Sequence, residues 1–335
     1  MIGSANGAHV SITGLGVHVP ERVVTNEELA QLVDTSDEWI TTRTGIRERR
    51  FSADDEALSD LCVPAIERAL AEAGVDPGEI DLVIVATVTP DMLFPSTGAI
   101  LSDRFGMDKA AAYDLSAGCT GFMYALSQAY GMVASGLSKR ALVVGADVLS
   151  KLMNFADRST CVLFGDGAGA VVLERVDEGG FLAFELGADG SGGVDLNLPA
   201  GGSRIPTTAE SVARGDHYVH MNGRQVFKFA TRVLVSSARQ VLDQAGLTVD
   251  DVDVYVPHQA NVRIIDHAVA KLGIPVERVV VNVDRYGNTS SASIPLALAD
   301  AIAEGRVHRG DTVLMTGMGA GLTWGSAVMN WTEDR

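Results

Sequence analysis

The sequence of 335 residues has few cysteines and no long apolar run. Its three cysteines, Cys62, Cys119 and Cys161, show no Cys-x-x-Cys spacing, which argues against a zinc site of cysteine pairs and against a disulfide framework. No stretch reaches about 18 uninterrupted apolar residues, so a membrane-spanning helix is not expected. Residues 1–10 lack the basic and apolar segments of a signal peptide. We therefore expect a soluble protein of a reducing cytoplasm, without a membrane partner.

Basic residues are also scarce. The chain has 26 Lys and Arg against 43 Asp and Glu, which gives a net charge of −17 at pH 7. This charge argues against a nucleic-acid partner, and an acidic protein partner would need a local basic patch. With 47% hydrophobic and 21% charged residues, the chain is expected to form one large globular domain or two of ordinary size.

Alternating strand and helix patterns predict an α/β protein. Residues 57–74 have the pattern of an amphipathic helix. Residues 81–88 form a continuous, largely β-branched apolar run, which is typical of a central parallel strand covered on both faces. Further strands are expected at residues 10–17, 112–116, 141–146, 252–256 and 312–316, and further helices at residues 120–136 and 225–241.

The second half of the chain repeats the first, which predicts two like α/β halves, residues 1–178 and 179–335. The corresponding segments are residues 73–84 with 245–256, the turn around Cys119 with 282–290, and residues 141–146 with 312–316. Asn288 then occupies the position in the second half that Cys119 has in the first. The glycine-rich residues 187–216 are expected to be a surface insertion.

Cys119 lies where a predicted strand turns into a predicted helix, between Gly118 and Gly121. A thiol at a helix N-terminus is expected to have a lowered pKa, which favours a nucleophile. The alternative is that Cys119 is a small buried hydrophobic residue. A histidine partner elsewhere in the chain favours the nucleophile.

His258 and Asn288 are the candidate partners of Cys119. His258 directly follows the strand at 252–256, at the end of the strand where α/β active sites lie. Taken alone, His258 could be structural, and Asn288 could be a turn residue after glycine. The duplication, however, brings the ends of all three strands to one face. A thiolate there could attack an acyl group while His258 and Asn288 donate hydrogen bonds to the oxyanion.

Three motifs, at residues 117–122, 257–261 and 287–293, resemble the active-site motifs of the β-ketoacyl-ACP synthase III family. That family initiates bacterial type II fatty acid synthesis, and the resemblance extends from Gly14 to Trp324. It implies the thiolase fold, with two βαβαβαββ halves in a five-layered α-β-α-β-α arrangement, as a homodimer. It implies no metal and no cofactor, since CoA is part of a substrate and the phosphopantetheine arm is carried by ACP.

The resemblance also implies a two-stage reaction. Cys119 takes an acyl group from acyl-CoA. Malonyl-ACP then decarboxylates, with His258 and Asn288 stabilising the enolate, and the carbanion attacks the acyl group to give 3-oxoacyl-ACP. By the same resemblance, CoA contacts Trp39, Arg43, Arg158 and Gly223, and ACP contacts Gln259, Arg263, Arg224, Lys228, Arg232 and Lys271. The acyl pocket contains Met318 and Phe94, and Phe94 is expected to reach across the dimer and close the pocket of the partner; the alternative is plain packing in the dimer interface.

Some of these residues carry a second interpretation. Composition alone favours Trp39 as a core residue, because tryptophan is mostly buried. Arg224, Lys228 and Arg232 recur every four residues and so share one helix face, which could also be an ordinary solvated face. Relatives often have asparagine in place of Arg224 and phenylalanine in place of Met318.

Three other functions are alternatives to the one that the resemblance implies. Residues 165–170 satisfy the GxGxx(G/A) pattern of dinucleotide-binding proteins, but a strand pattern follows them where a helix would be required. A non-enzymatic scaffold would have no need of Cys119, His258 and Asn288 together. The nearest alternative is a related condensing enzyme of polyketide or other secondary metabolism.

Overall fold

The computed structural model describes residues 8–334. Residues 1–7, which begin the first predicted half, and residue 335, which ends the second, lie outside the described residues. One five-stranded sheet has the strand order β1-β7-β6-β4-β5. The strands β4, β5 and β6 run parallel, and β7 is antiparallel to both of its neighbours. The strands of this sheet are β1 (His9–His18), β4 (Leu82–Ala86), β5 (Ala111–Leu115), β6 (Arg140–Val148) and β7 (Asp166–Val176).

A second sheet has four strands in the order β11-β12-β13-β8. They are β8 (Gly180–Ala188), β11 (Val254–Pro257), β12 (Thr312–Gly319) and β13 (Thr323–Asn330). The duplication predicts a strand before Asn288, and this prediction is wrong. In the place that β5 takes in the first sheet, the second sheet has only a single bridge between Tyr255 and Val279.

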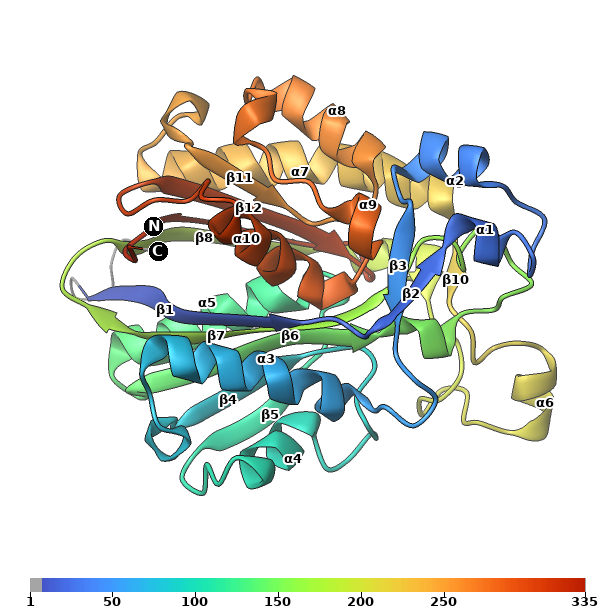
Figure 1. Ribbon diagram of the computed structural model, residues 1–335, viewed down its shortest axis with the longest axis horizontal. Coiled ribbons are helices and arrows are strands. Elements are labelled where there is room, and N and C mark those ends of the chain that lie inside the picture. The colour runs from blue at the N-terminus through green and yellow to red at the C-terminus, as the bar shows by residue number, and fades with distance from the viewer. Residues whose placement is uncertain (1–7, 335) are drawn as a thin grey trace.

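Helices cover both faces of both sheets and produce the five-layered arrangement that was predicted (Figure 1). Buried apolar side chains of α5 and α10 join the two sheets in the central layer. Side chains of α3 and α4 cover the first sheet, and those of α7 and α8 cover the second. These helices are α3 (Leu58–Ala73), α4 (Thr97–Arg104), α5 (Gly121–Ser135), α7 (Gly223–Ala245), α8 (Val262–Leu272) and α10 (Ser293–Ala303).

The sequence accounts for the central layers directly. All five residues of β4 are buried, as a strand with covered faces requires. The strand β1 has glycine at two positions where α3 approaches closely. A Cβ atom on Gly14 would lie 2.1 Å from the carbonyl oxygen of Ala69, and one on Gly16 would lie 2.1 Å from that of Ala65. Glycine is therefore required for this helix to lie against this strand.

Smaller elements surround one end of the sheets (Figure 1). They are β2 (Arg22–Thr25), β3 (Glu48–Phe51), β9 (Leu196–Asn197), β10 (His220–Met221), α1 (Asn26–Leu29), α2 (Asp37–Thr44), α6 (Ala209–Ala213) and α9 (Val283–Tyr286). Short 3₁₀ segments are η2 (Pro77–Glu79), η3 (Leu149–Leu152), η4 (Gly190–Asp195), η5 (Val249–Asp251), η6 (Val276–Arg278) and η7 (Ser290–Ala292).

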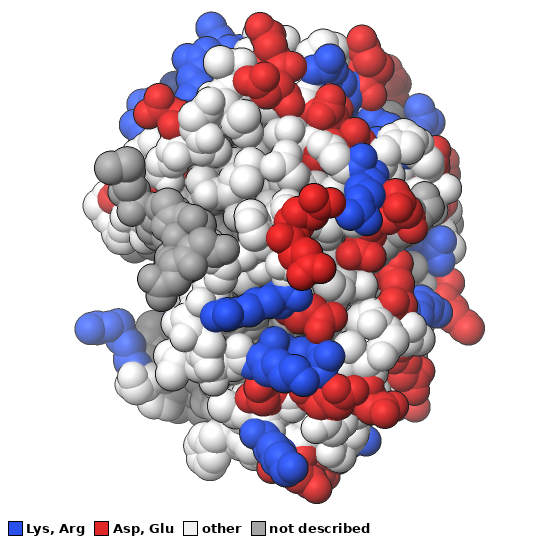
Figure 2. All heavy atoms as spheres, turned by 90° about the vertical axis from the view of Figure 1, so that its left-hand side faces the viewer, with Lys and Arg blue, Asp and Glu red and all other residues white. Residues whose placement is uncertain are grey.

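Within residues 8–334, no helix is both long and apolar enough to cross a membrane. Figure 2 shows the face that carries both chain termini, where Lys and Arg side chains are interspersed with Asp and Glu. This face therefore presents no single basic field.

Candidate active site

Cys119 lies on a tight turn between β5 and α5, as the sequence predicts. Gly118 has a φ of 58°, in the left-handed region, and a Cβ atom at this position would lie 2.6 Å from the backbone nitrogen of Ala320. Only glycine allows this turn to approach the loop after β12 so closely. The turn holds the Cys119 thiol in a fixed, buried place, with only 8% of the residue exposed.

The predicted lowering of the Cys119 pKa is wrong for the resting protein. The pKa of the thiol is raised to about 11, chiefly by burial; the Ser290 hydroxyl acts in the opposite direction, and the nearby carboxylate of Asp147 adds to the raising. The loss of hydration therefore raises the pKa of the thiol by more than the N-terminus of the helix lowers it. The resting thiol keeps its proton at neutral pH.

His258 follows β11, and its backbone N–H donates to the carbonyl of Thr316 at 2.7 Å. The side chain is buried, and burial lowers the pKa of the imidazole to about 3, so the ring is neutral. The ring Nδ1 forms a hydrogen bond with the Ser293 hydroxyl. The ring Nε2 has no hydrogen-bond partner among residues 8–334.

The Ser293 hydroxyl connects His258 to the backbone. Its oxygen accepts from the N–H of Gln259 at 3.4 Å. Among residues 8–334, Nδ1 is the only hydrogen-bond acceptor that the Ser293 hydroxyl contacts, so we infer that this hydroxyl donates its proton to Nδ1. A neutral ring with an accepting Nδ1 carries its proton on Nε2.

Asn288 lies in a loop that begins at Gly287, whose φ of 65° again requires glycine. The backbone N–H of Ser290 donates to the side-chain oxygen of Asn288 at 2.9 Å. This bond fixes the orientation of the amide and leaves its NH₂ group as the free end. The backbone of Asn288 also bonds to the segment before β7. Its N–H donates to the carbonyl of Leu163 at 2.8 Å, and its carbonyl accepts from the N–H of Gly165 at 3.0 Å.

The glycines of residues 165–170 shape the backbone beside the site and do not open a nucleotide-binding helix. They lead into and form part of β7, which is antiparallel to both neighbours. A Cβ atom on Gly165 would lie 2.3 Å from the carbonyl oxygen of Tyr286, in the loop that carries Asn288. The dinucleotide-binding alternative therefore fails.

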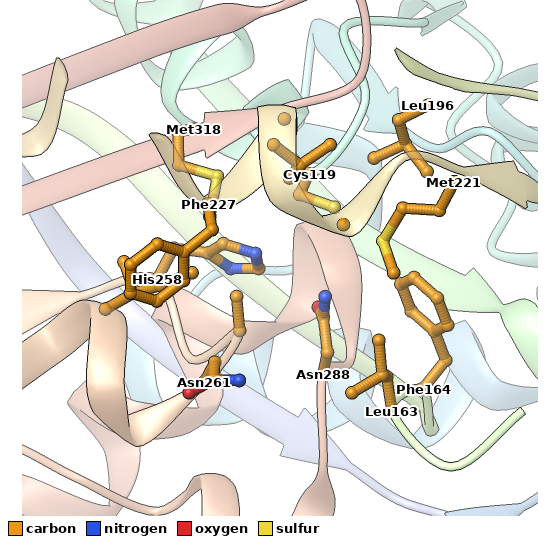
Figure 3. A pocket seen from close by; sticks show the side chains of 15 residues that line it. Cys119, Leu163, Phe164, Leu196, Met221, Phe227, His258, Asn261, Asn288 and Met318 are labelled. Atoms are coloured by element: carbon orange, nitrogen blue, oxygen red, sulfur yellow. The ribbon is translucent and has the colours of Figure 1, made fainter. Parts of the chain in front are cut away.

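Cys119, His258 and Asn288 line one pocket of about 150 Å³, as the sequence predicts (Figure 3). The other residues that line it are Leu163, Phe164, Leu196, Met221, Gly223, Val226, Phe227, Ala260, Asn261, Ile264, Met318 and Gly319. A thiol and two nitrogen donors thus meet in a largely apolar space. This arrangement suits acyl transfer, in which negative charge develops on a carbonyl oxygen.

Comparison with known proteins identifies the family. A family model described as 3-oxoacyl-[acyl-carrier-protein (ACP)] synthase III matches residues 113–190, and one described as its C terminal matches residues 242–331. The β-ketoacyl-[acyl-carrier-protein] synthase III of Symbiobacterium thermophilum is 58% identical over 96% of this chain and 98% of its own length. This chain belongs to the β-ketoacyl-ACP synthase III family. It is an acyltransferase, a condensing enzyme of fatty acid synthesis.

Solved structures of the family agree with this assignment. The β-ketoacyl-ACP synthase III of Thermus thermophilus is 51% identical, with a TM-score of 0.89 over 96% of this chain and 99% of that chain. The enzyme of Pseudomonas aeruginosa is 42% identical, with a TM-score of 0.90 over 98% and 99%. A priming β-ketosynthase of a polyketide pathway is 41% identical, with a TM-score of 0.90 over 98% and 97%. The thiolase fold is confirmed, and the higher identities favour fatty acid synthesis over the polyketide alternative.

A second cavity, of about 190 Å³, lies on another side of Cys119 and was not predicted. It is lined by Val88, Gly118, Cys119, Leu149, Leu152, Phe164, Leu196, Asn197, Leu198, Val219, Ser290 and Ala320. These residues come from η3, β9 and several loops, so no local pattern in the sequence marks them. Residues 187–216, which include β9, are therefore part of the wall of the site and not merely a surface insertion.

The two residues predicted for the acyl pocket do not line one common cavity. Met318 is buried and lines the first pocket, beside His258. Phe94 is 84% exposed and lines neither cavity. A role for Phe94 in an acyl pocket would require a second copy of the chain.

Three of the four predicted CoA residues, Trp39, Arg43 and Arg158, form a cluster, and the carbonyl of Arg43 accepts a hydrogen bond from Asn261, which lines the first pocket. Ser36 caps α2 by accepting from the backbone N–H of Trp39 at 3.1 Å. The guanidinium carbon of Arg43 lies 4.5 Å from the centre of the Trp39 ring, and that of Arg158 lies 5.1 Å from it. Trp39 is half-buried and packs against a cluster of buried residues that includes Ile40 and Ile46, so it combines a core contact with an exposed part. Gly223, at the start of α7, lines the first pocket.

Apart from Gln259, the predicted ACP residues lie on two helices, with Arg263 and Lys271 on α8 and the other three on α7. Arg263 is exposed, and its guanidinium carbon lies 5.6 Å from the ring centre of Phe227, which lines the first pocket. Arg224, Lys228 and Arg232 are exposed along one side of α7. Lys271 is exposed at the far end of α8, eight residues or about 12 Å from Arg263.

Gln259 is a correction to the predicted ACP residues. Its side chain is buried, with 1% of the residue exposed. Its NH₂ group donates to the carbonyls of Pro257 and Val280 at 2.7 and 3.0 Å, and its oxygen accepts from the N–H of Asn282 at 2.9 Å. Gln259 therefore ties the His258 segment to the Asn288 segment and does not reach a docking partner.

No group of three or more His, Cys, Asp or Glu side chains in the described part of the chain could hold a metal ion.

Proposed function

We propose that the chain carries out the priming condensation of fatty acid synthesis with an acyl-CoA and malonyl-ACP as substrates. Cys119 accepts the acyl group, and His258 and Asn288 serve the decarboxylation of malonyl-ACP. The observation that carries this proposal is the meeting of one thiol and two free nitrogen donors in one pocket.

The hydrogen bonds around the site support a donor role for both nitrogen groups. Ser293 leaves the Nε2 proton of His258 free, and Ser290 leaves the NH₂ group of Asn288 free. Two such donors would stabilise the enolate oxygen that forms when malonyl-ACP loses carbon dioxide. Removal of one oxyanion donor typically lowers the rate by about 10² to 10³.

The two cavities support a division between acyl chain and carrier. The second cavity, beyond Cys119, has a mostly aliphatic and aromatic lining and suits a short acyl chain. The first pocket is lined by Gly223 and by Phe227, over whose ring the exposed Arg263 lies, and it would admit the pantetheine arm of CoA or ACP. Trp39, with the guanidinium groups of Arg43 and Arg158 close to its ring, offers an aromatic surface and positive charge for the nucleotide of CoA.

Two surfaces support contacts with other proteins. Arg263 and the exposed basic side of α7, the helix that supplies Gly223, Val226 and Phe227 to the first pocket, would dock the acidic ACP, whereas the face with the termini has mixed charge (Figure 2). For a homodimer, β5 is an edge strand with one neighbour in its sheet. The nearby loop exposes Met92, Leu93 and Phe94, at 49%, 78% and 84%.

Three buried free thiols also fit the reducing cytoplasm.

Intact-mass spectrometry after incubation with a panel of acyl-CoAs tests the proposal. The protein should gain the mass of one short acyl group on Cys119, and Cys119→Ser should gain none. Acylation that persists in Cys119→Ser, or that maps to Cys62 or Cys161, would contradict the assignment. The panel also reports the preferred primer.

A further inference from the structure

The resting thiol of Cys119 holds its proton, and that proton must leave before Cys119 attacks an acyl-CoA. His258 does not take it in this arrangement, because its Nδ1 is occupied by Ser293 and its Nε2 carries a proton. We propose that Ser290 and Asp147 form a proton relay that deprotonates Cys119 during acylation, an inference that rests on the proposed role of Cys119 as acyl carrier.

Ser290 has two unusual features beside the thiol. Its φ of 52° lies in the left-handed region, which is unfavourable for serine. Its hydroxyl oxygen is buried and completes no aligned hydrogen bond with any described residue. The Ser290 hydroxyl lines the second cavity together with Cys119, and it opposes the effect of burial on the pKa of both the Cys119 thiol and the Asp147 carboxyl. A buried, unpaired hydroxyl in a strained residue is costly, and such features gather at functional sites.

Asp147, at the end of β6, is fully buried. Its Oδ1 accepts from the hydroxyls of Thr87 and Thr89 at 3.0 and 2.9 Å and from the N–H of Val88 at 2.8 Å. Its Oδ2 accepts only from the N–H of Ser291, at 3.2 Å, among the bonds of the described chain. Oδ2 therefore accepts fewer hydrogen bonds than Oδ1, and its one donor is the residue next to Ser290.

The groups around Asp147 leave its carboxylate as the acceptor of the proton. Burial raises its own pKa, so the carboxylate binds a proton more readily than an exposed one. The titratable groups that face it are the thiols of Cys119, before α5, and Cys62, in α3. Burial raises the pKa of both thiols, so both stay neutral at rest. His258, across the pocket, is neutral as well.

The relay conserves atoms and charge. The Sγ proton of Cys119 moves to the Ser290 oxygen as the Ser290 proton moves to Oδ2 of Asp147. The thiolate forms a bond to the carbonyl carbon of the acyl-CoA, and the bond from that carbon to the CoA sulfur breaks. The proton on Asp147 then returns through Ser290 to the leaving CoA thiolate, and the carboxylate is restored.

The first test is the single-turnover rate of Cys119 acylation by acetyl-CoA, measured by rapid quench and intact mass from about pH 6 to about pH 9. Ser290→Ala keeps the carboxylate and should lower the rate by about 10²-fold. Its rate should then rise roughly tenfold for each pH unit, because hydroxide replaces the relay, while the wild-type rate should change less. The control is Ser237→Ala, which removes a buried hydroxyl paired with Ser326 between α7 and β13.

A second variant separates the relay from a simple charge effect. Asp147→Asn removes a negative charge next to the thiol, which alone would raise the thiolate fraction and speed acylation. The relay predicts slower acylation instead. If circular dichroism shows that Asp147→Asn does not fold, Ser290→Ala decides by itself.

The relay is wrong if Ser290→Ala acylates within about twofold of the wild-type rate with the same pH profile, or if a folded Asp147→Asn acylates as fast as wild type or faster. Failure of the wild-type protein to acylate on Cys119 would instead contradict the proposed function.

Discussion

Two serines each hold one atom of a catalytic side chain and leave the other atom facing substrate. The Ser290 N–H holds the oxygen of Asn288, and the Ser293 hydroxyl holds Nδ1 of His258. Both serines belong to residues 287–293, so one segment orients both proposed oxyanion donors. Amide and imidazole orientations depend on such neighbours, because each ring or amide has one donor and one acceptor end when neutral.

The first prediction concerns the tautomer of His258. Ser293→Ala removes the partner of Nδ1, so the ring can place its proton there and lose the Nε2 donor. Decarboxylation of malonyl-ACP should fall by about 10². Acylation of Cys119 should fall less, because it does not depend on that donor.

Ser293→Thr, which keeps the hydroxyl, should restore most of the decarboxylation rate, and ¹⁵N NMR of labelled histidine should report the tautomer in each variant. Equal losses in both half-reactions, or no rescue by threonine, would indicate a structural role for Ser293.

The second prediction concerns Trp39. Trp39→Ala should raise the KM for acetyl-CoA by about tenfold with little change in kcat, because base–aromatic stacking is worth about 1–3 kcal/mol. Acetyl-pantetheine, which lacks the nucleotide, serves as the matched substrate. A similar rise in KM for both thioesters would rule out a contact between Trp39 and the nucleotide.

At the scale of elements, much was predictable where a pattern is local. Residues 81–88 predicted β4, residues 57–74 predicted α3, and the glycines around Cys119 predicted its turn. What depends on burial was not predictable. The motif around Gln259 does not reveal that its amide is enclosed by Pro257, Val280 and Asn282, and the turn at Cys119 does not reveal how far desolvation raises the thiol pKa.

The third prediction concerns α7 and α8. Arg263→Glu, or Lys228→Glu together with Arg232→Glu, should raise the KM for malonyl-ACP at least about tenfold at low salt, and added salt should shrink the difference. Acylation of Cys119 by acetyl-CoA should remain near the wild-type rate. Lys139→Glu makes the same charge change at an exposed position between α5 and β6 and should leave the KM for malonyl-ACP unchanged.

Loss of acylation together with malonyl-ACP use in the Arg263 or α7 variants would point to CoA binding or misfolding, and the docking surface would be wrong.

At the scale of the whole molecule, duplication predicted the architecture but not its departures from symmetry. The first half has β5, whereas the second has a single bridge at Val279, and the Asn288 loop instead bonds to Leu163 and Gly165 of the first half. Contacts between the halves therefore complete the site. The division into halves at residue 178, the roles of the site residues and the dimer remain predictions.

The fourth prediction concerns the dimer. Light scattering should give about twice the 35.2 kDa of one chain. Phe94→Thr should let longer acyl-CoAs acylate Cys119, because an exposed phenylalanine of one copy is proposed to close the cavity of the other. A monomer in solution would contradict the dimer, and an unchanged chain-length profile would leave Phe94 only a packing role.

The central claim, that Cys119 carries the acyl group between two half-reactions, is tested most directly by a single-turnover chase. Protein acylated with ¹³C-labelled acetyl-CoA is freed of CoA and mixed with malonyl-ACP. We predict that the acyl mass leaves Cys119 and that one equivalent of labelled 3-oxoacyl-ACP appears at the same rate, with release of carbon dioxide. Labelled acyl group that stays on Cys119 while unlabelled product forms would contradict the account.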